Sequence, residues 1–232
     1  MNIIDGVIRN LTIEGDIDFA DYPDIKSLGK LKYIGGHADF ADSRITSLEN
    51  LECIGGGANF GGGANFRNSR ITNLGKLKFI YGGADFENSQ ITDLGNLEYI
   101  GGTVYFENSQ VTSLGKLEHI GGHADFQNSR ITSLENLECI GGGADFENSQ
   151  ITDLGNLECI GGGANFRNSR ITSLGKLKFI GADVDFSDSS LTSLGKLNHI
   201  GGEAYISKDQ EETLGKQLEK RNFRYNIIIR IK

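Results

Sequence analysis

The sequence predicts a β-solenoid, a coil of short parallel strands in which each turn packs on the next. Three observations predict it. Phenylalanine recurs every twenty residues from Phe66 to Phe186, the copies lie in the phrase Gly-Gly-x-Ala-Asp/Asn-Phe-x-Asn-Ser or a close variant of it, and residues 61–72 are identical to residues 161–172. A strict period of this length is typical of stacked units that bury their apolar sides on one another. We therefore expect the 232 residues to form one elongated domain.

The composition agrees with a thin, regular molecule. Only 38% of the residues are hydrophobic, and the chain has 33 Gly, one Pro and no Trp. No stretch reaches the roughly 18 apolar residues of a membrane span, and residues 1–6 have no basic and apolar leader pattern. We expect a cytoplasmic protein of a bacterium, or of the host cytoplasm if a phage encodes it, without membrane contact.

Charge is distributed unevenly. The net charge is −8, and because residues 203–232 carry seven Lys/Arg and five Asp/Glu, residues 1–202 hold a net charge of −10. Direct nucleic-acid binding needs clustered Lys and Arg, so an acidic body argues against it. The charge permits a basic partner or imitation of a nucleic acid.

One turn shows how the coil is built. In the unit 144–163, Ala144 and Phe146 alternate with Asp145, which is the period of a short strand with one buried face. The apolar residues that follow are spaced too irregularly for one helix, and they predict a tight polar arc. Glycines at 161–163 let the backbone turn into the next strand. About nine turns follow this pattern, and we expect these side chains of the unit to point inward: Phe146, Ile151, Leu154, Leu157 and Ile160.

The phrase Ala144-x-Phe146-x-x-Ser149-x-Ile151 resembles the short bacterial form of the leucine-rich repeat, L-x-L-x-x-N-x-L. The resemblance covers residues 17–206. It implies a right-handed coil with parallel strands on one face, used mostly to bind other proteins. The sequence departs from that family where Ala replaces the first strand leucine and Ser replaces the asparagine.

The same phrase also resembles the pentapeptide repeat, whose twenty residues form a square coil. That coil would turn Asn156 inward and expose Leu157 and Ile160. Burial of an unpaired Asn costs about 1–3 kcal/mol per turn. We therefore favour the leucine-rich type and keep the square coil as the weaker resemblance.

We divide the chain into an N-terminal strand cap (1–16), the repeat solenoid (17–206) and a C-terminal helix–strand cap (207–232). A six-residue duplication around 55–66 must loop out or double a strand. Ser207-x-x-Gln210 resembles a capping box that opens a helix to about Arg221. Ends of a solenoid need such covers because they expose strand edges. The apolar cap residues are Ile3, Ile4, Val7, Ile8, Leu11 and Ile13 at the start, and Phe223, Tyr225, Ile227, Ile229 and Ile231 in an alternating strand at the end.

No catalytic, cofactor or metal site is expected. His119 and His199 share a column with aromatic residues and are interpreted as packing residues, while His37 and His123 have no metal-ligand spacing. We expect three free thiols at Cys53, Cys139 and Cys159, because disulfides are rare in the cytoplasm and parallel side chains fit them poorly.

The candidate site is the exposed strand column, where Asp recurs and Tyr interrupts it. Its repeated positions are Asp18, Asp39, Asn65, Asp85, Tyr105, Asp125, Asp145, Asn165, Asp185 and Tyr205. Stacked Asp residues repel, so the column serves either solubility or binding. Because the turns are near copies, a partner finds its register only at unlike positions. The candidate partner-binding residues are Asp85, Tyr105, His123, Asp125, Asp145, Asp183, Asp185 and Tyr205.

These observations favour a non-enzymatic protein that binds a basic protein partner through the strand face, as a monomer rather than a dimer. The alternative is an acidic, nucleic-acid-mimicking inhibitor of a host enzyme, of the phage or mobile-element type.

Overall fold

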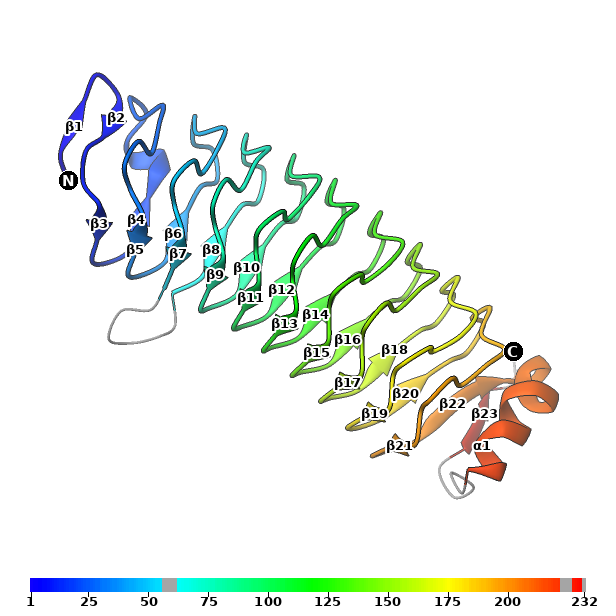
Figure 1. The fold of residues 1–232 in the computed structure, drawn as a ribbon. Coiled ribbons are helices and arrows are strands. Elements are labelled where there is room, and N and C mark those ends of the chain that lie inside the picture. The colour runs from blue at the N-terminus through cyan, green and yellow to red at the C-terminus, as the bar shows by residue number, and fades with distance from the viewer. Residues whose placement is uncertain (56–61, 222–226, 231–232) are drawn as a thin grey trace.

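The computed structural model describes residues 1–55, 62–221 and 227–230. In these residues the chain forms an elongated parallel β-solenoid of about ten turns, with a β-hairpin at one end and a short helix at the other (Figure 1). Each turn contributes a two-residue strand to each of two parallel sheets, except that β22 of the last turn has four residues, and equivalent residues of successive turns pair in register. The predicted fold class is confirmed.

The first sheet, here called the acidic sheet, contains the Ala-Asp part of each repeat. Its order follows the chain, so each strand pairs with the next turn. The strands are β4 (Ile17–Asp18), β6 (Ala38–Asp39), β8 (Ala64–Asn65), β10 (Ala84–Asp85), β12 (Val104–Tyr105), β14 (Ala124–Asp125), β16 (Ala144–Asp145), β18 (Ala164–Asn165), β20 (Val184–Asp185), β22 (Ala204–Ser207) and β23 (Ile227–Arg230).

The second sheet, here called the aromatic sheet, was not expected. It contains β3 (Thr12–Ile13), β5 (Tyr33–Ile34), β7 (Cys53–Ile54), β9 (Phe79–Ile80), β11 (Tyr99–Ile100), β13 (His119–Ile120), β15 (Cys139–Ile140), β17 (Cys159–Ile160), β19 (Phe179–Ile180) and β21 (His199–Ile200). The expectation of strands on one face is therefore wrong. The dipeptide before each glycine corner also alternates, with Ile160 buried and Cys159 turned outward, and two residues suffice for a ladder.

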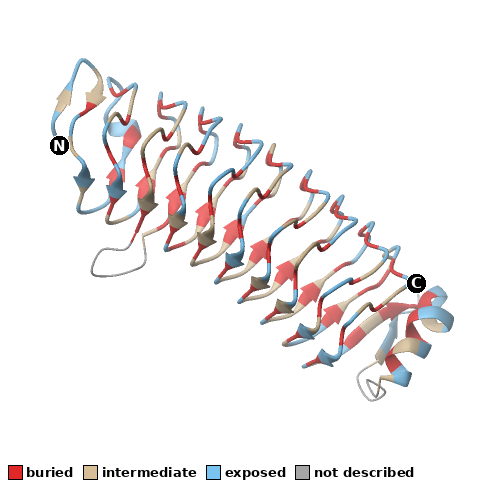
Figure 2. Ribbon diagram, viewed as in Figure 1, coloured by how far each residue is buried: buried red, intermediate tan, exposed pale blue. Residues whose placement is uncertain are grey.

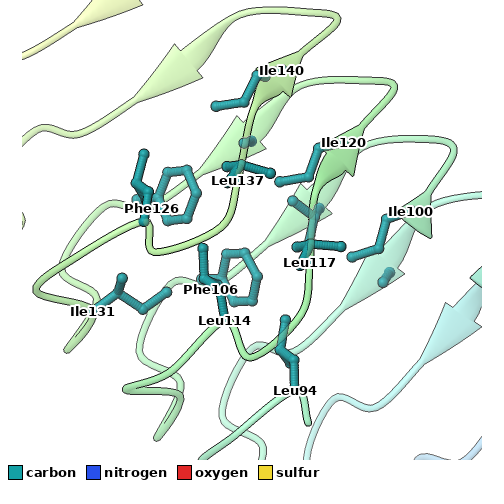
Figure 3. Close-up of a cluster of buried hydrophobic side chains, with 14 of the residues drawn as sticks. Leu94, Ile100, Phe106, Leu114, Leu117, Ile120, Phe126, Ile131, Leu137 and Ile140 are labelled. Atoms are coloured by element: carbon teal, nitrogen blue, oxygen red, sulfur yellow. The ribbon is translucent and has the colours of Figure 1, made fainter. Parts of the chain in front are cut away.

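The core is a set of columns along the solenoid axis. Nine phenylalanines from Phe19 to Phe186 stack with ring centroids 4.7–5.7 Å apart and planes within 20°. Figure 3 shows Phe106 and Phe126 beside the leucine and isoleucine columns. Offset stacking contributes about 0.5–1.5 kcal/mol per pair beyond the burial of apolar area.

Burial separates the two coil types considered for the sequence. The five predicted inward residues of the type unit, Phe146, Ile151, Leu154, Leu157 and Ile160, are all buried, and the same pattern repeats along the solenoid (Figure 2). Asn156 is only half-buried. The side-chain pattern of the square coil is therefore wrong for this chain.

The third side of each turn is hydrogen-bonded in pairs of turns. Among the described residues, isolated backbone bridges join one turn to the next and then skip a turn: Val7–Ser27, Ser47–Asn73, Asp93–Ser113, Ser133–Asp153 and Ser173–Ser193. Between several pairs an asparagine side chain makes the connection instead. Asn50, Asn96 and Asn136 donate from Nδ2 to the carbonyls of Gly29, Gly75 and Gly115 at 2.8, 3.2 and 2.8 Å. On this side the structural repeat is two turns.

A column of serines lies inside the coil at the position of the leucine-rich asparagine. Ser129 and Ser149 are buried, and their hydroxyl oxygens have no hydrogen-bond partner among the described residues. The same holds for Ser43, Ser69, Ser89, Ser109 and Ser169. Their backbone N–H groups close a local turn instead, as Ser149 N donates to Phe146 O at 3.1 Å. Here serine acts as a small filler of the core and forms no side-chain ladder.

The N-terminal cap covers the first turn only in part. β1 (Ile3–Ile4) and β2 (Val7–Ile8) form an antiparallel hairpin, and Ile8 is fully buried. Ile4 and Leu11, expected to be covering residues, are exposed. At the duplication, the second copy forms β8, which pairs with both β6 and β10. Most of the first copy lies outside the described residues.

The C-terminal cap begins with the predicted capping box. Gln210 Oε1 accepts from Ser207 N at 2.9 Å, and its Nε2 donates to Phe186 O and Ser189 O at 3.0 and 3.1 Å. The helix runs through η2 (Lys208–Gln210), the π-helical η3 (Glu211–Gly215) and α1 (Lys216–Lys220). Leu214 and Leu218 close the core. β23 then pairs with β22 in parallel, while the expected strand residues Phe223, Tyr225 and Ile231 lie outside the described residues.

Candidate interaction face

The predicted column lies on the outer side of the acidic sheet, one residue per turn. Register pairs place Tyr105 between Asp85 and Asp125, and Asp145 between Asp125 and Asn165. Inward neighbours such as Ala124 and Ala144 are buried, so the column is held by the core beneath it.

Each Asp or Asn of this column also has a local structural role. Its Oδ1 accepts a hydrogen bond from the backbone N–H two residues later, at 2.9 Å for Asp145 and Glu147 and at 3.1 Å for Asn165 and Arg167. Such bonds define an Asx turn, which bends the chain out of the strand. The sequence interpretation took these residues as solvated charges and missed this bond.

Amide side chains relieve the repulsion between the carboxylates. Gln127 Nε2 donates to Asp145 Oδ2 at 3.0 Å, and Asn165 Nδ2 donates to Glu147 Oε2 at 3.1 Å. Directly opposed like charges destabilise a sheet, and an interposed amide donor replaces repulsion with a hydrogen bond. The face is therefore a hydrogen-bonded polar surface, interrupted by two tyrosines.

A shallow hollow lies beside Tyr105, lined by Asn65, Asp85 and Thr103 with His37 at its edge. Tyr105 is 46% exposed, and its ring is large enough to form one wall of the hollow. It replaces the Asp of other turns, so its turn has no Asx bond from this position. Tyr105 is thus a departure from the repeat on the exposed side of the sheet.

A second hollow lies further along the same face, lined by His123, Asp145, Asp183, Asp185 and Tyr205. The cap closes one end of it, because Arg230 pairs with Asp185 at 3.0 Å and lies 4.8 Å from the centre of the Tyr205 ring. Tyr205 donates to Glu203 Oε2 at 2.5 Å, and this hydrogen bond raises the pKa of its hydroxyl.

The structure brings the candidate residues together on one face. Seven of the eight line the two hollows, and Asp125 lies between them on β14. Tyr205 and Asp185 are engaged by Arg230 within the chain, while Tyr105 is free of such a cover among the described residues. Tyr105 is therefore the more accessible aromatic residue.

The aromatic sheet has an outward column that sequence reasoning assigned to packing. His119 and His199 are exposed, so the interpretation as packing residues is wrong. His199 stacks on Phe179 at 4.5 Å between ring centroids, on the outside of the sheet. The signal in the sequence was the alternation with buried isoleucine at the next position.

The same column contains a disulfide between Cys139 and Cys159, so the expectation of three free thiols is wrong. These residues are register partners on adjacent turns, 4.9 Å apart between Cα atoms, which is the spacing of neighbouring strands. Cys53 is the free cysteine. Because disulfides persist in oxidising compartments, the cysteines give no support to a cytoplasmic location.

The fold defines the class of the protein, a parallel β-solenoid built from twenty-residue repeats. No family model, curated protein or solved structure matches the chain. In the described residues, no group of three or more His, Cys, Asp or Glu could hold a metal ion, and no helix there is long and apolar enough to cross a membrane.

Proposed function

We propose that this solenoid is a non-enzymatic interaction module of the leucine-rich type, which binds a protein partner with a basic surface through the acidic sheet. The observation that carries the proposal is the hollow beside Tyr105, where an exposed aromatic ring stands among Asp residues on the outer face. Aromatic anchors in such settings supply much of the energy of protein interfaces.

The near identity of the turns supports Tyr105 as the anchor. A partner that contacts only repeated Asp residues would bind equally well one turn further along, because equivalent positions present the same groups. Tyr105 breaks this degeneracy in the middle of the sheet. Asp85 and Asp125 flank it in register and supply a negative rim.

The acidic rim favours a basic partner for an electrostatic reason. Asp85 and Asp125 use Oδ1 to accept from the backbone, at 2.9 Å in both, which leaves the second carboxylate oxygen as an acceptor for a donor of a partner. A Lys or Arg of a partner gains a charge-assisted hydrogen bond there. Exposed pairs of this kind contribute less than about 1 kcal/mol each and steer association more than they hold it.

The alternative function, imitation of nucleic acid, has less support from the arrangement of charges. A nucleic acid carries negative charge at regular intervals along its backbone, whereas Asn65, Tyr105 and Asn165 interrupt this column. It is kept as an outcome of the experiment below.

The test is affinity capture from the native host with three baits: the unmodified chain, Tyr105→Ala and Tyr33→Ala. Tyr33 is a matched control because it is also 46% exposed but lies on the aromatic sheet. Proteins captured by the unmodified chain and by Tyr33→Ala, but lost with Tyr105→Ala, are the expected partners. The affinity of the leading partner should fall by about 2 kcal/mol with Tyr105→Ala and by less than about 1 kcal/mol with Asp145→Ala.

Other results would contradict the proposal. Equal, small effects of Tyr105→Ala and Asp145→Ala, with a large loss on removal of residues 207–232, would place the site on the C-terminal cap. Binding that DNA displaces, with a steep dependence on salt, would favour mimicry. Thermal melting of each variant checks that the fold is intact.

A further inference from the structure

The disulfide between Cys139 and Cys159 lies on the outer side of the aromatic sheet. Both cysteines are half-buried, while the next residue of each strand, Ile140 or Ile160, is fully buried. Both cysteines also line an open hollow of about 630 Å³ on this side of the solenoid. The disulfide is therefore on a surface that a second molecule can reach.

The fold at this point is held by contacts that do not require the disulfide. Gly161 N donates to Ile140 O at 2.8 Å between the two turns. The matching bond from Gly201 N to Ile180 O is 2.9 Å between β19 and β21, which contain no cysteine. The buried apolar columns continue beneath both pairs of turns. Reduction of the disulfide therefore leaves its two turns joined, so it can take place in the folded chain.

The two cysteines have different neighbours along the outward column. His119 is the register partner of Cys139, whereas Phe179 is the register partner of Cys159. An imidazole beside a thiolate stabilises it through a ring N–H and, when protonated, through its charge. An apolar ring gives no such stabilisation. Because a better stabilised thiolate leaves faster in thiol–disulfide exchange, Cys139 is the better leaving group of the pair.

The other charged groups of the hollow balance one another. Lys178 Nζ pairs with Glu158 at 2.7 Å, and Lys176 and Glu138 complete the charged part of the lining. Two lysines and two glutamates give no net charge. The imidazole of His119 is therefore the group that makes the two ends of the disulfide unlike.

We propose that Cys139–Cys159 is a redox-active disulfide, which exchanges with a thiol reductant that enters this hollow. A thiolate of the reductant attacks Sγ of Cys159, the bond between the two cysteines breaks, and Cys139 leaves as a thiolate beside His119. A second thiolate of the reductant then attacks the reductant's sulfur in the mixed disulfide and releases Cys159. The disulfide gains two electrons, and two protons from the reductant's thiols, while the reductant is oxidised to a disulfide.

This inference goes beyond the proposed function and stands apart from it. The strands with the cysteines, β15 and β17, belong to the aromatic sheet, whereas Tyr105 belongs to the acidic sheet. Failure of the exchange reaction would therefore leave the proposed binding through Tyr105 untouched.

The first experiment is reduction of the full, folded chain at neutral pH by glutathione and, separately, by reduced thioredoxin. Samples are quenched with acid, alkylated and mapped by peptide mass spectrometry, so that Cys53 is counted apart from the disulfide cysteines. We expect the native chain to be reduced within about tenfold of the rate in denaturant, because the bond is accessible. The circular dichroism spectrum should not change. The faster reductant distinguishes a small thiol from a protein dithiol as the source.

Two results would overturn the proposal. The native chain could stay oxidised with both reductants while the denatured chain is reduced. Alternatively, the disulfide could be lost only together with the spectrum of the folded state, which would make reduction a consequence of unfolding.

The second experiment tests the order of bond breaking by early quenching of the reaction with glutathione. We expect the mixed disulfide mainly on Cys159. His119→Phe should slow reduction by about three- to tenfold and remove this preference, whereas His119→Lys retains a cation and should preserve it. His199→Phe is the matched control, since His199 lies in the same column and is a register partner of neither cysteine.

The substitutions suit the fold, because Phe already occupies this column in β9 and β19. A merely structural role of His119 would change the rate without changing which cysteine carries glutathione. Equal amounts of mixed disulfide on Cys139 and Cys159 in the unmodified chain would overturn the proposed order.

Discussion

Two glutamates occupy backbone conformations that glycine holds in the other turns. Glu49 and Glu135 both have φ of 50°, where equivalent positions are Gly29, Gly75 and Gly155. Left-handed conformations cost an L-residue with a side chain about 1 kcal/mol relative to glycine. The positions where a Cβ would clash include Gly75 and Gly155, which lie one turn after Glu49 and Glu135. A Cβ on Gly75 or Gly155 would lie 2.4 Å from the carbonyl oxygen of Glu49 or Glu135.

Glu135→Gly should therefore stabilise the fold by roughly 0.5–1 kcal/mol. Two alanine variants provide the comparison. Gly175 has φ of 54° and no atom lies within 4 Å of a Cβ added there, so Gly175→Ala is destabilised by backbone strain alone. Gly155→Ala adds the clash with the Glu135 carbonyl and should cost more than Gly175→Ala. Urea unfolding midpoints give the ranking, and a loss of stability in Glu135→Gly would contradict it.

The serine column leads to a second prediction at this scale. Removal of the buried Ser129 hydroxyl takes away a polar atom without a hydrogen-bond partner in the described residues. Burial of such a group costs on the order of 1–3 kcal/mol, against a small cavity left by its loss. Ser129→Ala should leave the unfolding free energy unchanged or raise it by up to about 1 kcal/mol. A decrease larger than about 1 kcal/mol would show that the hydroxyl is hydrogen-bonded.

At the scale of elements, the sequence predicted the strand with Phe146 and the buried arc, and it missed the second sheet. The first strand has three alternating residues and a distinctive phenylalanine. The second has only two residues, Cys159 and Ile160, and its outward position varies among Tyr, Cys, Phe and His. We interpreted these residues as packing against the core. The outward position varies because a surface position accepts many side chains. The disulfide was missed for the same reason, since its geometry appears only when the column is known to face outward.

The C-terminal cap depends on one buried amide. Gln210→Ala removes the bonds to Phe186 O, Ser189 O and Ser207 N, of which Phe186 O keeps Ser189 N and Oγ as donors. The expected cost is about 2–3 kcal/mol, confined to the cap and the last turn. Hydrogen exchange should accelerate at Ser207 and stay unchanged in β14 and β16. Glu211→Ala, which breaks an exposed ion pair with Lys208, is the control and should cost less than about 1 kcal/mol. Uniform acceleration along the solenoid would contradict a local role.

The cysteines give a prediction with a chemical readout. Alkylation in denaturant without reductant should label one cysteine, Cys53, and all three after reduction. In the folded chain, burial raises the pKa of the Cys53 thiol, which also donates to Gly55 O at 3.3 Å. The thiolate is the reactive form, so labelling of the native protein should be slow at neutral pH and should accelerate only above the ordinary pKa of cysteine. The folded state favours the protonated thiol, so this group stabilises the fold below its ordinary pKa and less as pH rises through the raised value. Three labels without reductant would contradict the disulfide.

At the scale of the whole molecule, the face of the candidate site was predictable and its internal bonding was not. Alternation placed Tyr105, Asp125 and Asp145 on one exposed column, because a strand has no other way to arrange them. The position of Arg230 over Tyr205 could not be predicted from the sequence, because it depends on how the C-terminal cap returns to the sheet. The acidic column therefore differs along its length: open near Tyr105, and partly occupied by the chain itself near Tyr205.

Because turns are bridged in pairs on the third side, each turn is either the first or the second member of a pair. Backbone bridges such as Asp93–Ser113 and Ser133–Asp153 join two turns, and Asn136 connects neighbouring pairs through its side chain. Between the pairs Ser133–Asp153 and Ser173–Ser193 the connector is Lys176, whose Nζ donates to Asn156 Oδ1 at 2.6 Å. An internal duplication or loss of one turn would exchange the two roles in every later turn. A change of two turns restores the roles. We therefore expect insertion or deletion of two turns to disturb the third side less than insertion or deletion of one, although the sequence repeats after one turn.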